Sequence, residues 1–398
     1  MLLFPQLPQI KLDPFVFTPY FEARERYQRR TAKGFSTKVH DSTSVFESRY
    51  RVGFTVTDNK QFTGKAIYQY AHTLQWAAAK NNSFQGSDLY VGEGDWKLDK
   101  NNTLRLGRQI ILKGGSRLFE ESFFGQRSKS FDVARVQGTN YDVWGGRVGL
   151  SPVAQDHAEI AGASYDWPSN IGESMVVFKH DQWLTKENFW TFDHRDVLTF
   201  GHGRQKTEAE LEGAFQKGRY TGLNLNSYFL HARIGRGLAK SWGTYIEGNI
   251  FSGGKNSTST QGFDNLYGAT HDFLGRMDVV GTRNIENIEL AATYKGIPKL
   301  QLGVTYNHFW LVNASDGLYS TTNGSLYSVG GHKAIDTNGQ SGRDVGQEEN
   351  LLARYDFNKN LWVGSEIGFF QPGGFIKKIV GPGNTSQFWG MIYINLKF

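Results

Sequence analysis

Strict alternation of apolar and mixed residues marks the last segment of the chain and recurs along most of its length. One side of residues 388–398 carries Phe388, Gly390, Ile392, Ile394, Leu396 and Phe398, and the other carries Trp389, Met391, Tyr393, Asn395 and Lys397. A period of two predicts a β-strand with one apolar face and one mixed face. The segment therefore predicts a strand that separates an apolar environment from a polar one.

Similar segments recur and are joined by two kinds of connection. Short polar turns at 57–60, 99–102, 296–298 and 358–360 are hairpin signals, whereas 253–262 and 314–346 are long polar stretches. We predict about 18 strands, with 263–284 as the ambiguous segment. The predicted strands cover residues 15–30, 44–58, 61–75, 88–99, 102–112, 130–139, 142–150, 156–165, 172–180, 194–203, 206–217, 222–235, 241–252, 285–295, 299–312, 347–357, 360–371 and 386–398.

Two architectures fit this alternation. A soluble propeller or large sandwich would bury the apolar faces, and a membrane barrel would turn them toward lipid. Short turns that alternate with long loops are typical of a membrane barrel. Three further features favour the barrel: the polar face is rich in paired Arg and Glu, aromatic residues cluster near strand ends, and the last residue is Phe398. We therefore predict an all-β fold with one domain over residues 1–398, a single closed antiparallel transmembrane β-barrel in the bacterial outer membrane.

Composition agrees with a barrel and excludes a helical membrane protein. The chain has 398 residues, of which 14% are aromatic, 47 are Gly and only 9 are Pro. No stretch approaches the roughly 18–20 consecutive apolar residues that a membrane helix needs. Cysteine is absent, which a large hydrogen-bonded sheet tolerates. Residues 1–6 lack the basic and apolar regions of a signal peptide, so we expect none in this sequence.

The face opposite the apolar one is rich in arginine. Because lipid would cover the apolar side, strand phase predicts that the other side lines an aqueous lumen. The pore-lining residues predicted by phase are Arg24, Arg26, Glu47, Arg49, Arg51, Arg147, Arg354 and Glu366. A formal net charge of +6 and an arginine-weighted lumen indicate an anionic solute, since guanidinium groups bind carboxylates as planar forks. The alternative for each arginine is a structural ion pair that braces the barrel wall.

Two further arginines do not follow this phase. Arg108 shares parity with Leu104 and Leu106, and Arg135 lies beside Phe131 and Val133. Alternation alone would therefore turn both toward lipid, where an arginine at the midplane costs about 2–4 kcal/mol. Either a bulge changes the register, or the side chains lie near the membrane interface.

Two stretches resemble the alginate export family of outer-membrane barrels. One is Leu104-Arg105-Leu106-Gly107-Arg108-Gln109 with the later Phe131-Asp132-Val133-Ala134-Arg135, and the other is Phe370-Gln371-Pro372-Gly373-Gly374-Phe375 with the strand that follows. The resemblance implies a barrel of 18 strands with an electropositive pore that passes a secreted polyuronate. It also implies that Arg108 and Arg135 shape the pore, and it adds them to the predicted pore-lining residues.

We therefore predict a passive channel for an anionic oligo- or polysaccharide, with alginate-like export favoured by the resemblance. Outer-membrane lipid and periplasmic export machinery are the other expected partners. The alternative is an uptake porin for small anions or carboxylates. The direction of transport and the oligomeric state are open at this point.

Other functional classes find little support in the sequence. Neither a Gly-x-Ser-x-Gly elbow nor a His-Glu-x-x-His motif occurs, and the ten histidines are scattered. Basic and aromatic residues interleave on opposite faces rather than on one platform, which argues against nucleic-acid binding. We expect no enzymatic activity, no catalytic residue, no metal and no cofactor.

Overall fold

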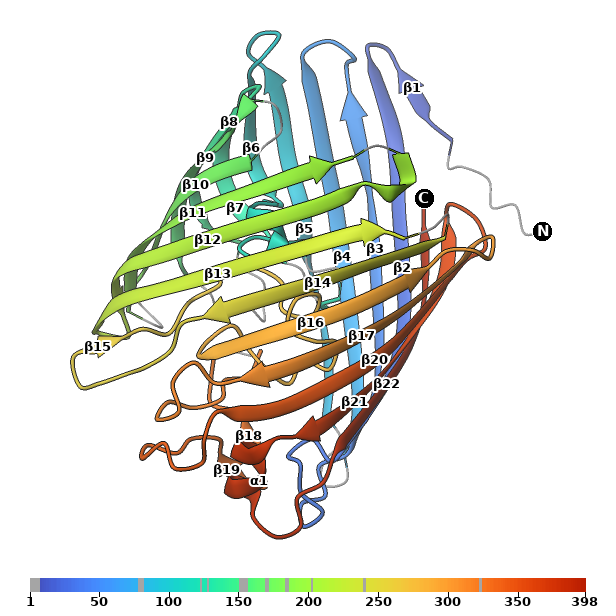
Figure 1. The fold of residues 1–398 in the computed structure, drawn as a ribbon. Coiled ribbons are helices and arrows are strands. Elements are labelled where there is room, and N and C mark those ends of the chain that lie inside the picture. Colours follow the sequence, from blue (N-terminus) through green and yellow to red (C-terminus); the bar gives the residue numbers. More distant parts are fainter. Residues whose placement is uncertain are drawn as a thin grey trace.

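The computed structural model describes residues 8–77, 82–121, 124–126, 129–149, 157–168, 172–182, 186–201, 203–238, 241–321 and 324–398 (Figure 1). Eighteen antiparallel strands close into one barrel. They are β2 (Phe15–Thr31), β3 (Thr43–Thr57), β4 (Phe62–Ala77), β5 (Asn82–Lys97), β6 (Thr103–Gln109), β7 (Phe131–Gln137), β8 (Tyr141–Val148), β9 (Glu159–Asp166), β10 (Gly172–Asp181), β11 (Glu187–Phe200), β12 (Thr207–Tyr220), β13 (Leu223–Gly237), β14 (Trp242–Phe251), β16 (Ile285–Tyr294), β17 (Leu300–Trp310), β20 (Asp344–Asp356), β21 (Leu361–Pro372) and β22 (Gln387–Lys397).

Four short strands and three short helices lie outside the eighteen barrel strands in the described part of the chain. The strands are β1 (Ile10–Leu12), β15 (Ser259–Thr260), β18 (Ser328–Val329) and β19 (His332–Lys333), and the helices are η1 (Gly114–Ser116), η3 (Gly203–Gln205) and α1 (Gly374–Val380). Among the described residues, no helix is long and apolar enough to span a membrane.

Each barrel strand pairs with the next along the chain, and the first pairs with the last. The closing register of β2 and β22 runs from Glu22 opposite Lys397 to Thr31 opposite Phe388. The predicted closed all-β barrel is therefore confirmed, and each of the eighteen predicted segments corresponds to a barrel strand. The largest boundary difference is in β11, which begins at Glu187 rather than at residue 194, because its inward residues mix apolar and charged side chains and weaken the alternation.

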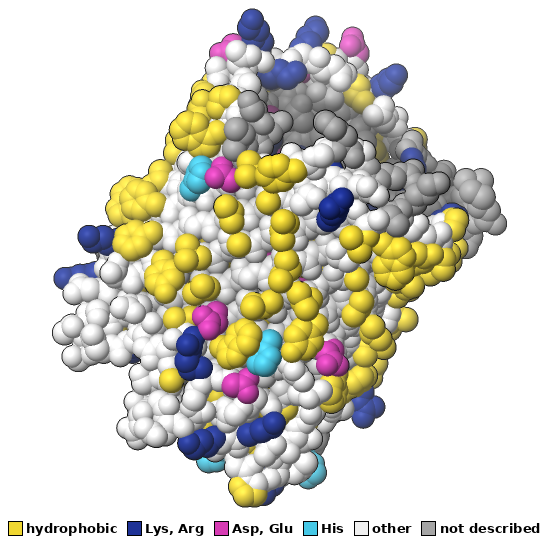
Figure 2. Space-filling view, in the orientation of Figure 1, with side chains coloured by type: hydrophobic (Ala, Val, Ile, Leu, Met, Phe, Trp, Pro, Cys, Tyr) yellow, Lys and Arg dark blue, Asp and Glu magenta, His cyan; other side chains and the backbone are white. Residues whose placement is uncertain are grey.

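The outer wall carries the apolar side chains. Val52, Leu351 and Ile392 are 58%, 60% and 53% exposed, although each lies in the middle of a regular strand. Figure 2 shows such hydrophobic side chains spread across the strands of one face of the molecule. A continuous apolar outer surface on a closed barrel is the arrangement that a lipid environment stabilises.

The two ends of the barrel differ. The short strand β1 and the C-terminus lie at the end that carries the tight turns (Figure 1), which we call the short-turn end. At the other end, the loop end, the long connections 110–130, 252–284 and 311–343 join strands. Their apolar side chains belong to one buried core with inward residues of the strands, for example Phe119, Tyr267 and Leu318 with Phe131 and Trp144. The bore is therefore filled by packed loops toward the loop end.

Candidate functional site

Four arginines from β2 and β3 form one row on the inner wall of the barrel, as predicted. Arg24, Arg26, Arg49 and Arg51 are between 1% and 4% exposed. Arg26 Nε donates to Glu47 Oε2 at 2.6 Å, and Arg49 Nη2 donates to Glu22 Oε1 at 2.7 Å. This row, which we call the arginine wall, is neutralised in part by carboxylates from the same two strands.

The arginine wall also holds a loop segment. Arg26 Nη1 donates to the Phe124 carbonyl at 2.6 Å, and Arg49 Nη1 donates to the Gly125 carbonyl at 3.0 Å. Arg24 Nη2 donates to Gln126 Oε1 at 2.7 Å and to the Gly125 carbonyl at 3.1 Å. These contacts supply donors to carbonyl groups of a half-buried loop segment. The arrangement gives these arginines a structural contact with residues 124–126 in addition to their place in the bore.

Two other predicted residues also face inward in paired contacts. Arg135 forms a fork with the Asp142 carboxylate on the neighbouring strand, with Nε to Oδ1 at 2.8 Å. Glu366 is 9% exposed and contacts the loop residue His271, with 3.6 Å between Glu366 Oε2 and His271 Nε2. Arg135 reaches the inner wall without a register shift, because Phe131 and Val133, with the same parity, also face inward.

Arg354 is the predicted arginine that retains most access to the bore. Its side chain is 41% exposed, its Nε donates to Asp356 Oδ1 at 2.8 Å, and its guanidinium carbon lies 4.7 Å from the Trp362 ring centre. Leu351 and Tyr355 on the same strand point outward and are exposed to the lipid side, so alternation places Arg354 inside. Its guanidinium is therefore oriented by its neighbours and still open to a solute.

Two adjoining cavities connect this region with the arginine wall. One has a volume of about 180 Å³, and its charged lining consists of Arg24, Arg26, His271, Asp272, Arg276 and Glu366. The other has about 260 Å³, and its charged lining consists of Arg276, Lys295, Arg354 and Glu366. Both are also lined by Tyr393. We call the two cavities together the bore site. Among the described residues, five Lys or Arg side chains face two carboxylates there, so the bore site favours anions.

His271 joins the loop to the wall of the bore site. Its ring stacks on Phe124 with 3.5 Å between ring centres, and its Nδ1 lies 3.1 Å from Asp278 Oδ2. Burial alone lowers the pKa of His271, but the carboxylates of Asp278 and Glu366 outweigh it and raise the pKa to about 9. The histidine is therefore a cation at neutral pH and adds positive charge to the bore site.

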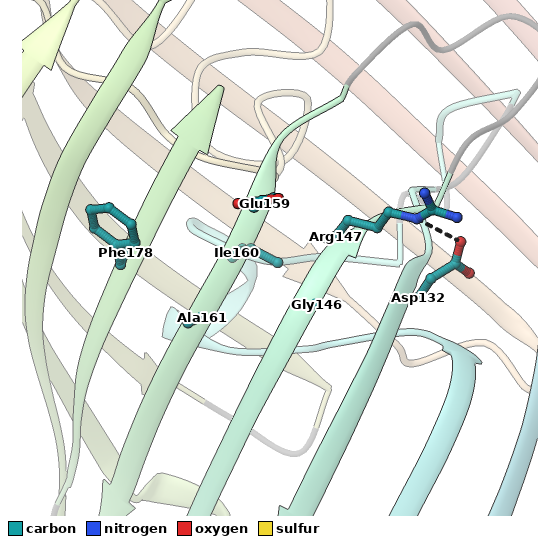
Figure 3. A pocket seen from close by; sticks show the side chains of 7 residues that line it. All are labelled: Asp132, Gly146, Arg147, Glu159, Ile160, Ala161 and Phe178. Carbon is teal, nitrogen blue, oxygen red and sulfur yellow. Dashed lines mark ion pairs between the residues drawn. The ribbon is translucent and has the colours of Figure 1, made fainter. Parts of the chain in front are cut away.

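Two predicted pore residues face the opposite way. Arg108 and Arg147 lie on the outer wall, so the prediction that they line the pore is wrong. Both guanidiniums approach Asp132, with Arg108 Nε at 2.7 Å from Oδ1 and Arg147 Nε at 3.8 Å from Oδ2. Figure 3 shows Arg147 and Asp132 turned toward each other. Both line a hollow of about 540 Å³ together with Ala161 and Phe178.

The error at Arg147 has a physical cause. The phase that places Arg147 inside requires the apolar Trp144 and Val148 to face lipid, yet both are 2% exposed and belong to the core inside the barrel. Trp144 meets the Phe119 ring of the inserted loop edge-on, at 6.1 Å between ring centres. Arg147 has the opposite parity and is 60% exposed. Arg108 faces outward with Leu106, as their shared parity predicts. Its guanidinium group donates two hydrogen bonds to the Asp132 carboxylate, which neutralises its charge.

Sequence reasoning missed the residues that loops bring into the bore. Arg276 and His271 lie in the segment 263–284, whose structure the sequence left ambiguous. Arg117, next to η1, is 3% exposed and contacts Glu210 at 2.7 Å and Glu212 at 2.9 Å on β12. A loop residue has no periodic pattern that identifies it. The only signal in the sequence for these cations was the set of acidic residues at inward strand positions, which they contact.

A closed antiparallel barrel with an apolar outer wall and a charged bore defines the class of outer-membrane β-barrel channels. Comparison with known proteins agrees, because the family model for alginate export matches residues 182–389, which is more than half of the chain. The chain belongs to the alginate export family, and the protein is a channel of the bacterial outer membrane. Since tight turns face the periplasm in such barrels, the loop end is extracellular.

Solved structures share this fold at low sequence identity. OccK5 (OpdH) and OpdQ of Pseudomonas aeruginosa align with TM-scores of 0.63, at 11% and 13% identity, and each alignment covers 96% of this chain and 98% of the other. OccK2 (OpdF) of the same organism, solved in complex with glucuronate, aligns with a TM-score of 0.59 and 12% identity over 96% of this chain and 98% of its own. A search of curated protein sequences found no match.

Proposed function

We propose that this protein is a passive outer-membrane channel for anionic saccharides that carry carboxylate groups. The observation that carries the proposal is the bore site, where five basic side chains and the cationic His271 face the carboxylates of Asp272 and Glu366. A cation-lined cavity with low-dielectric walls concentrates anions. Membership of the alginate export family supports a uronate-bearing solute.

The proposed mechanism is capture followed by release between weak sites. Arg354 presents an exposed guanidinium on the periplasmic side of the bore site, and Arg276 lies in both cavities. A carboxylate would pass from one cation to the next, because each is already paired with a carboxylate, Asp356 or Asp272, that weakens its hold. Conduction requires binding that is loose enough for release.

The cargo has two candidates within this class. Family membership supports a polyuronate, and export would then need periplasmic machinery to deliver the polymer. The size of the cavities supports a small carboxylate, because about 180 Å³ and 260 Å³ are below the roughly 300–1,000 Å³ of pockets for drug-sized molecules. Structural relatives solved with glucuronate or vanillate support the second candidate, since both compounds carry a carboxylate.

We also propose that the protein is not an enzyme. Its charged residues in the bore are arranged as ion pairs between wall and loops, such as Arg26 with Glu47 and Arg117 with Glu210. A binding-and-release role uses these charges without any group that must change its covalent state.

Conductance in planar bilayers tests the proposal and separates its two candidates. We expect anion-over-cation permeability in a salt gradient, and block by uronates added to either side. If single uronates block and oligomers of six units do not, the small-carboxylate candidate holds. If the hexamer blocks more strongly and its passage can be followed as resolved dwell times, the polymer candidate holds. Cation selectivity of the unmodified channel would contradict the proposal as a whole.

A further inference from the structure

Two basic side chains stand on the outer wall near the extracellular end of β12. Lys217 and Arg219 share the outward parity of Leu211 and Phe215, which are 55% and 42% exposed, and both bases are themselves exposed. Within the described part of the chain, neither side chain forms an ion pair or a hydrogen bond. Two residues of strand separate side chains on one face by about 6.6 Å. The pair therefore presents two unneutralised positive charges side by side.

The neighbours of this pair on the adjoining strands carry no charge. On β11, Asn188 lies opposite Arg219 and Trp190 lies opposite Lys217. On β13, Asn224 and Asn226 occupy the corresponding positions. We call Lys217, Arg219, Asn188, Asn224 and Asn226 the basic rim. Figure 2 shows Lys or Arg side chains projecting at the left margin, where β12 and β13 end in Figure 1.

An apolar surface begins directly below the basic rim. Trp190 is 47% exposed, and one step toward the middle of the barrel Phe192, Phe215 and Tyr228 are 52%, 42% and 42% exposed at paired positions on the three strands. Cations and amides above aromatic side chains match a molecule with an anionic head and apolar chains. A soluble saccharide would use only the upper part of this surface.

The charged residues around Arg147 on the outer wall differ from the basic rim. There Arg108 and Arg147 are balanced by Asp132, and Glu159 lies directly opposite Arg147 on β9 (Figure 3). That hollow lies at the same end of the barrel and on the same outer wall. Its charges neutralise one another, so it has no electrostatic reason to hold an anion, whereas the basic rim has one.

We propose that the basic rim binds the phosphate groups of an outer-leaflet lipid, whose acyl chains lie along Trp190, Phe192, Phe215 and Tyr228. Lys217 and Arg219 neutralise the phosphates, and the three asparagines donate amide hydrogen bonds to their oxygens. The position at the extracellular end of β12 places the cations at headgroup depth, where a charge on the lipid side costs little. The lipid in turn neutralises cations that the protein leaves unpaired.

The test is a titration of the purified protein in neutral detergent with lipid A that carries two phosphates, followed by native mass spectrometry. For K217Q/R219Q we expect binding about thirtyfold weaker than for the unmodified protein, from about 1 kcal/mol for each cation near a membrane surface. Lipid A without phosphates should bind the unmodified protein and the double variant equally. R236Q is the matched control, because Arg236 is an exposed outward base on β13 at the periplasmic end, and its affinity should stay within about twofold.

A charge-conserving exchange and a substitution at Trp190 extend the binding test. The exchange K217R/R219K retains both charges and should retain binding. If the double glutamine variant does not fold, the single variants K217Q and R219Q replace it, and each should bind about fivefold more weakly. W190A should weaken binding of both lipids by removing the acyl contact. Equal affinity of K217Q/R219Q and the unmodified protein for the bisphosphorylated lipid would overturn the proposal. So would inorganic phosphate or an oligouronate that displaces the lipid from the unmodified protein at concentrations comparable to the lipid itself.

Discussion

The inner wall of the barrel has two contrasting regions. On β2 and β3 it is made of arginines and glutamates. On β7 and β8 its part nearest the loop end, beyond the Arg135–Asp142 pair, is made of Phe131, Val133, Trp144 and Val148. Both regions face the bore and both are covered by loops. The arginine wall meets the carbonyl groups of residues 124–126, whereas the apolar region meets the rings of Phe119 and Tyr267.

The difference shows that the loop groups packed against each region of the inner wall determine whether that region is polar or apolar. A wall that meets backbone carbonyls needs donors, and guanidinium groups supply several from each side chain. A wall that meets aromatic rings needs apolar surface. Polarity alone therefore identifies the inner face only where the bore is filled with water or with polar groups, and it fails at β8.

The largest effect on stability should come from shortening a side chain in the apolar region of the inner wall. Trp144→Ala removes a side chain that is 2% exposed and packed against Phe119, and we expect a loss of about 3–5 kcal/mol in the free energy of unfolding. Urea unfolding of the detergent-solubilised protein measures it. Leu351→Ala on the outer wall is the control and should cost about 1 kcal/mol or less. Equal losses for both variants would show that Trp144 has no packed partner inside.

The arginine wall should be nearly as sensitive. Arg26→Gln leaves the buried Glu47 carboxylate with Gln28 as a remaining donor at 3.0 Å, and we expect a loss of about 3 kcal/mol. Loss of the bond to the Phe124 carbonyl should also loosen residues 124–126 and raise the single-channel conductance. Arg354→Gln, at an exposed ion pair, should cost less than about 1 kcal/mol. The same urea experiment compares the two, and a greater loss for Arg354→Gln would contradict the assignment.

The contact between loop and wall at His271 should depend on pH. Because its pKa is raised from 6.5 to about 9 in the folded protein, its contribution is fully present below pH 6.5 and is lost as the pH rises through about 9. The contribution that disappears is about 3 kcal/mol by linkage. Unfolding free energies of the unmodified protein and of His271→Gln, measured from pH 6 to pH 10, should therefore converge at the alkaline end. Parallel curves would rule out this contact.

The smallest effect should be on ion selectivity. Arg354→Glu reverses a partly exposed charge in the bore, and we expect the anion-over-cation permeability ratio to fall about fivefold, equivalent to about 1 kcal/mol. Arg147→Glu makes the same charge change on the outer wall, so it should leave the ratio unchanged. Reversal potentials in a salt gradient measure both. A change of the ratio at Arg147 that matches the change at Arg354 would mean that Arg147 reaches the conduction path.

Much of the fold followed from alternation, and less of the site did. The strands and their outward apolar faces, for example the face that carries Ile392, were predicted because period-two patterning against lipid is strong. Arg354 and Glu366 were placed correctly on the inner side because their strands carry a clean apolar outer face. Arg147 was misplaced because both faces of β8 carry apolar residues and only the inserted loop distinguishes them.

By itself, the sequence determined a closed barrel of alternating strands with an apolar outside and a largely charged inside, because each strand encodes its own two faces. The tertiary structure alone decided which charges remain open to a solute. Long loops fold back into the bore and bring in His271, Arg276 and Arg117, and they cover Arg24, Arg26 and Arg49 while leaving Arg354 accessible. Contacts between residues far apart in the chain leave no periodic trace in the sequence, so only the folded arrangement reveals them.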